Sequence, residues 1–125
     1  PAANASLFDQ IARTGLIVSE HPPGTAPTRG RFVARSRITA ALAHVTVVVE
    51  AAARSGALTI AEHARALHRP VLALPGPVTS LTSVGCHTLL RDGHAELATT
   101  ATDVLTHLDR RRSSTARSDH RTPAP

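Results

Sequence analysis

The chain has 125 residues, which suffices for one compact domain and excludes a multidomain machine. It has no run of about 18 apolar residues, which argues against a membrane-spanning helix, and its single cysteine, Cys86, excludes an internal disulfide. The net charge of +5 comes from 14 basic residues, all arginine, against nine acidic ones. All-arginine usage fits guanidinium-based recognition, but a GC-rich coding bias explains it more simply.

The start of the sequence gives two expectations, one on cellular location and one on whether the chain is part of a longer protein. It shows no basic and apolar leader of the secretory type, so we expect a cytoplasmic protein with no membrane partner. It begins with Pro1 and contains no methionine, so we expect it to be a piece of a longer protein.

The first elements expected in chain order are a helix and a strand. The helix begins after the cap Asn4, carries Phe8 on a core-facing apolar stripe and ends at Gly15. Leu16 to Val18 has the pattern of a short buried strand. The stretch from 21 to 30 is rich in proline and glycine and predicts a loop.

The rest of the chain alternates between helices and apolar strands. The expected elements are a helix from Ser36 to about 43, a strand over 45–49, a helix over 57–68, a strand over 71–74, a helix over 85–91, a short strand over 95–97, and a helix from Thr100, capped by Asp103, to about Arg110. This alternation predicts an α/β fold with a parallel, doubly wound sheet covered by helices on both sides, in three layers. Residues 111–125 lack periodicity, and we expect a disordered Arg/Ser/Pro tail or linker.

A concentrated positive site surrounds one of the two aromatic residues. Four arginines fall within nine residues without an acid among them: Arg29, Arg31, Arg35 and Arg37. Phe32 lies between them. This arrangement suits unpaired nucleic acid, because guanidinium groups bind the backbone while the ring stacks on a base. In the alternative, Phe32 packs the following helix against the sheet and the arginines are solvated, and composition favours neither.

A second candidate site lies where the strand over 45–49 ends. Ligands of parallel sheets bind beyond the carboxyl ends of the strands, and there Ser55 and Gly56 open a helix whose free amides can hold a phosphate. Glu50 could orient a ligand, act as an acid–base group or anchor nearby backbone N–H groups. The motifs of hydrolases, dinucleotide-binding proteins, P-loop proteins and zinc proteases are absent from the sequence, so we expect no metal and no cofactor.

Several segments resemble the DNA processing protein A family, called DprA or Smf, over nearly all of residues 1–110. NASLFDQIARTGLIVSE followed by HPPGT is similar to the family's helix, strand and SEYPPG loop. RFVARSRITAAL resembles the signature FPxRNRIIxxL, and VVVEAAARSGALT resembles VVEAxxRSGSLxT. The spacing of residues 74–99 is also similar to that of the family.

The resemblance implies the carboxyl half of a Rossmann-like domain that binds single-stranded DNA without enzymatic activity. It also implies a homodimer that loads a RecA-type recombinase during DNA-mediated transformation. The DNA contacts that it implies are Arg29, Phe32, Arg35, Arg37, Ser55 and Gly56, with Glu50 and Thr59 beside them. Arg31, from the arginine cluster, completes the expected DNA-binding site. Two other hypotheses remain: a nucleotide phosphoribohydrolase that uses Glu50, and an inactive fragment.

Overall fold

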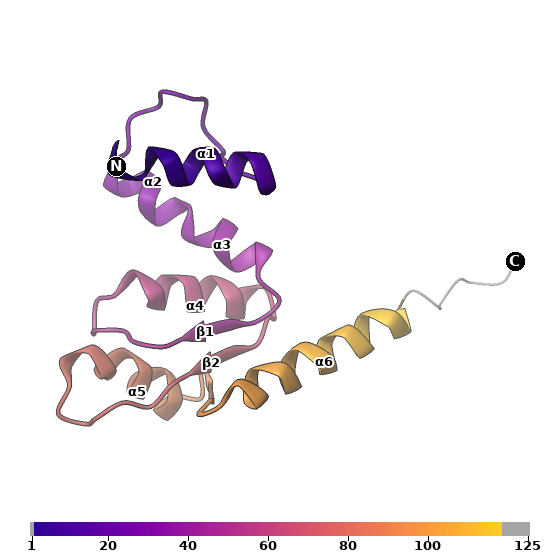
Figure 1. Cartoon of the computed structure of the whole chain (residues 1–125). Coiled ribbons are helices and arrows are strands. Elements are labelled where there is room, and N and C mark those ends of the chain that lie inside the picture. Colours follow the sequence, from indigo (N-terminus) through magenta and orange to yellow (C-terminus); the bar gives the residue numbers. More distant parts are fainter. Residues whose placement is uncertain (1, 119–125) are drawn as a thin grey trace, which may run out of the picture.

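The computed structural model describes residues 2–118 of the chain (Figure 1). Its elements are η1 (Ala2–Asn4), α1 (Ala5–Thr14), α2 (Arg29–Ala34), α3 (Ser36–Leu42), β1 (Thr46–Val48), α4 (Gly56–Ala66), β2 (Val71–Ala73), η2 (Leu81–Ser83), α5 (Val84–Arg91), β3 (Glu96–Leu97) and α6 (Ala101–Ser118). None of the helices within residues 2–118 combines the length and the apolar character needed to cross a membrane.

The three strands form one parallel sheet in the order β1-β2-β3. Val48 pairs with Ala73, and Leu72 pairs with Glu96. α4 connects β1 to β2, and α5 connects β2 to β3, because parallel neighbours need a crossover. The α/β class and the parallel sheet expected from the alternating pattern are confirmed.

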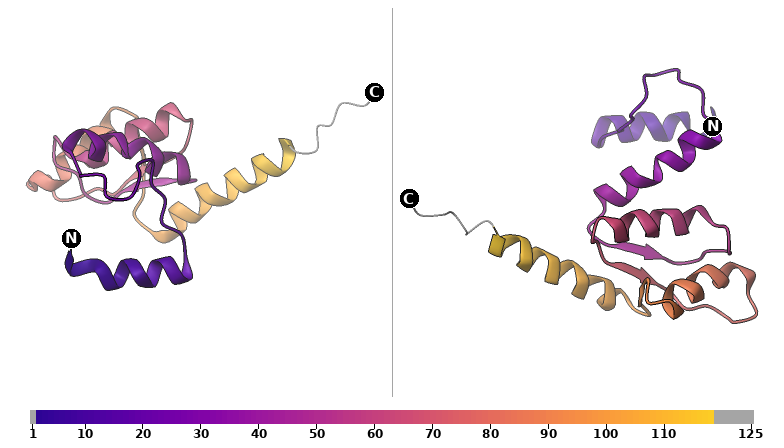
Figure 2. Two further views of the ribbon diagram at one scale, coloured as in Figure 1. Left: turned by 90° about the horizontal axis from the view of Figure 1, so that it is seen from above. Right: turned by 180° about the vertical axis from the view of Figure 1, so that it is seen from behind.

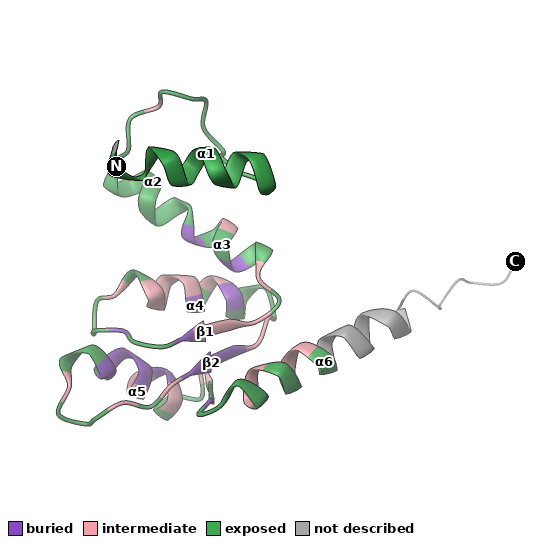
Figure 3. Cartoon of the chain, in the orientation of Figure 1, coloured by how far each residue is buried: buried purple, intermediate pink, exposed green. Residues whose placement is uncertain are grey.

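The core lies between the sheet and the helices that follow its strands, as the purple segments of α4, α5 and the strands show (Figure 3). Its residues are mostly small, with Ala61 and Ala64 of α4 fully buried, so the helix backbone can approach β1 closely. The Cys86 thiol donates to the Val48 carbonyl over 3.5 Å, and burial raises the pKa of that thiol. Cys86 is therefore a neutral packing residue of α5.

The amino-terminal segment differs from the expectation. α1 forms as predicted, but it has no buried residue, and Phe8, expected in the core, is 48% exposed. Leu16 to Val18 forms no strand, and all three side chains are at least half exposed. The physical reason is pairing: a strand needs a neighbour, and among residues 2–118 none lies beside this one. Figure 2 shows α1 set apart from the sheet.

One further boundary differs, and the expected start of the next helix at Ser36 is confirmed. The loop over 21–30 ends at Thr28, whose side chain caps α2 by accepting from the Arg31 N–H. Ser36 is buried and makes no capping hydrogen bond, because α3 continues almost directly from α2 through Arg35.

α6 begins with the expected capping box but is longer than expected. The Asp103 carboxylate accepts from the backbone N–H groups of Thr99 and Thr100, at 2.8 Å each. The helix continues to Ser118, so the tail expected to be disordered from 111 is helical as far as that residue. The remainder of that expectation, 119–125, lies outside the described residues.

Candidate functional site

Phe32 is presented to solvent by two short consecutive helices. It lies in α2, and the residue is 61% exposed. Arg35 follows three residues later, on the same side of the helical turn, and its guanidinium carbon lies 4.8 Å from the centroid of the Phe32 ring. This is a cation–π contact, which holds a positive charge over an exposed aromatic face.

The same ring lies against the amino-terminal end of α4. Phe32 Cε1 is 4.0 Å from the position that a Cβ on Gly56 would occupy. The Ser55 side chain caps α4 by accepting from the Ala57 N–H over 3.3 Å. The first amides of a helix have no intrahelical acceptor and carry partial positive charge. The structure thus joins the aromatic residue, Arg35, Ser55 and Gly56 in one surface, which we call the Phe32 surface.

The other arginines of the cluster differ in what they contact. Arg31 donates to the Ala26 carbonyl, and Arg37 forms an ion pair with Glu20. Arg29, at the start of α2, is exposed and has no such contact among the described residues. Two of the four guanidinium groups, those of Arg31 and Arg37, are therefore engaged with oxygen atoms of the chain, so fewer of them are open to a ligand than the count of arginines suggests.

A cavity of about 470 Å³ lies between the proline-rich loop and the helices α2 and α3. Arg31, Phe32 and Arg35 line it from the helices, and Pro22 and Pro27 are among the residues that line it from the loop. The hydrogen bond from Arg31 to the Ala26 carbonyl connects α2 to this loop, and the ion pair of Arg37 with Glu20 connects α3 to the residue just before the loop. The volume falls in the range of small-molecule sites, so the Phe32 surface borders a hollow that could accept a planar group.

Two predicted site residues, Glu50 and Thr59, are not part of the Phe32 surface. Glu50 follows β1 and is exposed, and Thr59 is half-buried on α4, one turn after Ser55. Arg54, which our sequence analysis did not select, is exposed in the turn immediately before Ser55. Its charge at the loop that ends β1 could have identified it from the sequence.

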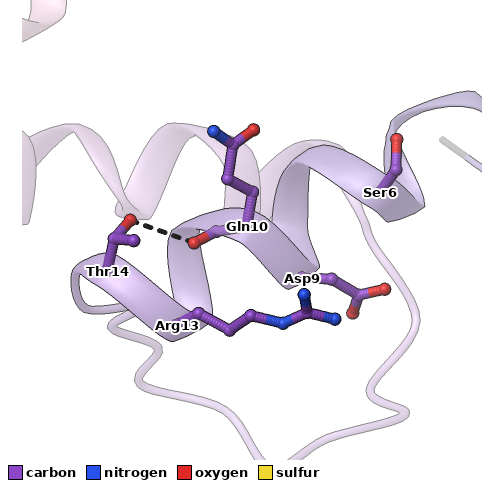
Figure 4. A pocket seen from close by; sticks show the side chains of 5 residues that line it. All are labelled: Ser6, Asp9, Gln10, Arg13 and Thr14. Atoms are coloured by element: carbon purple, nitrogen blue, oxygen red, sulfur yellow. Dashed lines mark hydrogen bonds between the residues drawn. The ribbon is translucent and has the colours of Figure 1, made fainter.

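Another depression lies on α1 alone (Figure 4). It is lined by polar residues, Ser6, Asp9, Gln10, Arg13 and Thr14. The Thr14 hydroxyl donates to the Gln10 carbonyl over 3.0 Å, within the helix itself. These residues form one polar face of a single helix, and we assign no chemistry to it. No group of three metal-ligating side chains occurs within the described part of the chain.

Comparisons with known proteins all match this chain to one family. The family model of DNA recombination-mediator protein A matches residues 1–109. A DNA processing protein DprA of Mycobacterium tuberculosis is 54% identical over 105 residues, which cover 84% of this chain and 27% of that protein. DprA of Streptococcus pneumoniae is 41% identical over 109 residues, covering 87% of this chain and 38% of that protein. The chain thus spans about a quarter to two fifths of these relatives.

Solved structures show the same likeness. The X-ray structure of DprA from Streptococcus pneumoniae superposes with a TM-score of 0.78 at 42% identity, over 85% of this chain and 37% of that one. A DNA processing protein A from Helicobacter pylori, whose structure concerns its single-stranded DNA binding mode, superposes with a TM-score of 0.76 at 30% identity. That match covers 88% of this chain and 50% of that one.

Proposed function

Because the chain belongs to the DNA recombination-mediator protein A family, also called DprA or Smf, we propose that it binds single-stranded DNA at the Phe32 surface. The observation that carries this proposal is the position of the Phe32 ring beside Gly56 at the start of α4, with the Arg35 guanidinium over the same ring. An aromatic ring, a cation and the open end of a helix then bind one ligand together.

Each part of this surface matches a part of an unpaired strand. An exposed aromatic ring stacks on any base, and such stacking contributes about 1–3 kcal/mol per base. The amides at the start of α4 and the guanidinium groups of Arg29 and Arg35 suit phosphate oxygens. A base paired inside a duplex does not offer its face to a ring, so the surface favours single strands.

In the wider proposal the protein acts by binding and not by catalysis, in the cytoplasm. The family to which the chain belongs supports the view that the bound strand is passed to a RecA-type recombinase during DNA-mediated transformation and recombination, and that the longer protein works as a homodimer. Since the chain spans a minor part of its relatives, these activities are proposed for the whole protein.

The experiment is a comparison of affinities by fluorescence anisotropy. The 125-residue chain should bind labelled oligothymidylate at least about tenfold more tightly than a duplex of the same length, since only the single strand can stack. Phe32→Ala should weaken single-strand binding, whereas Phe8→Ala, which alters the other exposed phenylalanine, should not. Circular dichroism checks that each variant is folded. Equal affinity for both DNA forms, or equal effects of the two substitutions, would overturn the proposal.

A further inference from the structure

Two of the most exposed large apolar side chains in the described part of the chain belong to one loop. Val78 is 88% exposed and Leu81 is 81% exposed, both between β2 and α5. Neither packs against the core, and both follow the carboxyl end of the central strand of the sheet. Ligands of parallel sheets bind at this end, so the position of these two exposed apolar side chains indicates a binding site.

This loop is joined directly to the loop that leads to the Phe32 surface. The Ala51 N–H donates to the Thr82 carbonyl over 2.8 Å, and the Gly85 N–H donates to the Ala51 carbonyl over 2.7 Å. On the other side, the Ser55 N–H donates to the Ala52 carbonyl. In Figure 1 the loops after β1 and β2 both lie at the left edge of the molecule, below α2. One rim therefore runs from Phe32 past Gly56 to Leu81.

We propose that the loop of residues 77–82 extends the single-strand site, with Val78 and Leu81 contacting the bases that follow the one stacked on Phe32. This inference rests on the proposed function and adds a second contact region to the same site. The occupant is the unpaired strand itself, continued beyond the Phe32 surface.

Charge along the rim supports a polyanion as the occupant. The segments 51–56 and 74–91 contain no acidic residue, and Arg54 is exposed in the turn before Ser55. The hydroxyls of Ser80 and Thr82 lie 2.9 Å apart in the same loop and are groups that commonly contact phosphate or sugar. Apolar side chains with hydroxyls beside them fit the faces of bases and the backbone that joins them.

The loop is also fixed in position before any ligand binds. Gly76 approaches Ser83 so closely that a Cβ at Gly76 would lie 2.1 Å from the Ser83 hydroxyl oxygen. The His87 ring nitrogen Nε2 is hydrogen-bonded to the Gly76 carbonyl over 2.9 Å. A loop that is held at both ends loses little conformational entropy on binding. The free energy gained by burying its exposed apolar side chains therefore adds to the affinity.

The test uses the 125-residue chain and oligothymidylates of about 4 and about 12 nucleotides, the range of site sizes known for single-strand grooves. The double substitution Val78→Ser and Leu81→Ser should weaken binding of the longer oligonucleotide by about fivefold and leave that of the shorter one within about twofold. Leu16→Ser is the control, since Leu16 is 80% exposed but follows α1. It should change neither affinity.

The outcomes separate this inference from the proposed function. If the unsubstituted chain binds neither oligonucleotide, the proposed function fails and this inference fails with it. If the chain binds both but the double variant loses no affinity for the longer one, or loses affinity for both equally, only the extension is overturned. Amide hydrogen exchange over residues 77–82 should slow when the longer oligonucleotide is present, and unchanged exchange would also overturn the extension. A change in oligomeric state of the double variant without a change in DNA affinity would assign the loop to protein contacts instead.

Discussion

The Phe32 ring lies beside Gly56 although the two residues belong to different helices. Because Phe32 Cε1 stands 4.0 Å from where a Gly56 side chain would begin, a methyl group fits at that position. Gly85 is different, since a Cβ there would lie 2.7 Å from the Ala51 carbonyl oxygen and 2.8 Å from the Ala51 Cβ.

These two glycines give a matched pair of stability predictions. Gly85→Ala should lower the free energy of unfolding by about 1–3 kcal/mol, since the neighbouring backbone must shift. Gly56→Ala should leave it within about 1 kcal/mol of the unsubstituted chain, because the methyl fits and alanine favours a helix. Urea denaturation followed by circular dichroism measures both. Equal effects at the two positions would contradict the close contact at Gly85.

The contacts of the arginines predict how DNA affinity depends on salt. For single strands, the logarithm of affinity falls against the logarithm of salt concentration with a slope of about −0.7 per phosphate contact. Arg29→Ala should therefore make the slope shallower by about 0.7, since its guanidinium is available to phosphate. Arg65→Ala, in the last turn of α4, should leave the slope unchanged. Anisotropy titrations at several salt concentrations decide this, and equal slopes for both variants would contradict it.

The ion pair between Glu20 and Arg37 predicts a gain of affinity on substitution. Glu20→Gln removes the carboxylate that neutralises the guanidinium, so the slope should steepen by about 0.7 and affinity at low salt should rise. Glu62→Gln, an exposed carboxylate on α4, is the control for the change in net charge. Adding Arg37→Ala to the first variant should cancel its gain. A gain of the same size in the control would mean that net charge alone is responsible.

The hydrogen bonds of the Asp103 carboxylate at the start of α6 predict that the protein loses stability in acid. The hydrogen bonds from Thr99 and Thr100 hold the pKa of the Asp103 carboxyl below its ordinary value of 3.8. A carboxyl group whose pKa is lowered by folding stabilises the fold above 3.8, and this contribution is lost as the pH falls through the folded-state pKa. Asp103→Asn should therefore lower thermal stability at pH 7 and change it little near pH 2. A difference that persists undiminished at the acidic end would contradict this role of the carboxylate.

The sequence predicts elements well where the information is local. The cap at Ser55, the capping box at Asp103 and the alternation of apolar segments identify α4, α6 and the parallel strands, because each depends on neighbours in the chain. Leu16 to Val18 shows the limit, since an apolar run forms a strand only beside a partner, and the run itself does not reveal whether one is present.

The sequence predicted residues of the candidate site but not which of its arginines are paired within the chain. Phe32 and Gly56 were both predicted from the sequence, and the packing of α3 on α4 accounts for their proximity. The short helix α2 was missed because the proline- and glycine-rich segment before it obscures the cap at Thr28. The ion pair between Arg37 and Glu20 joins residues 17 positions apart, and no local sequence pattern predicts it.

Ala51 joins the two loops at the edge of the sheet through its own peptide groups, by accepting from Gly85 and donating to Thr82. Main-chain bonds of this kind do not depend on which side chains the loops carry. Evolution can therefore alter the exposed residues of either loop, and with them the preference for particular bases, while the loops keep their positions relative to each other.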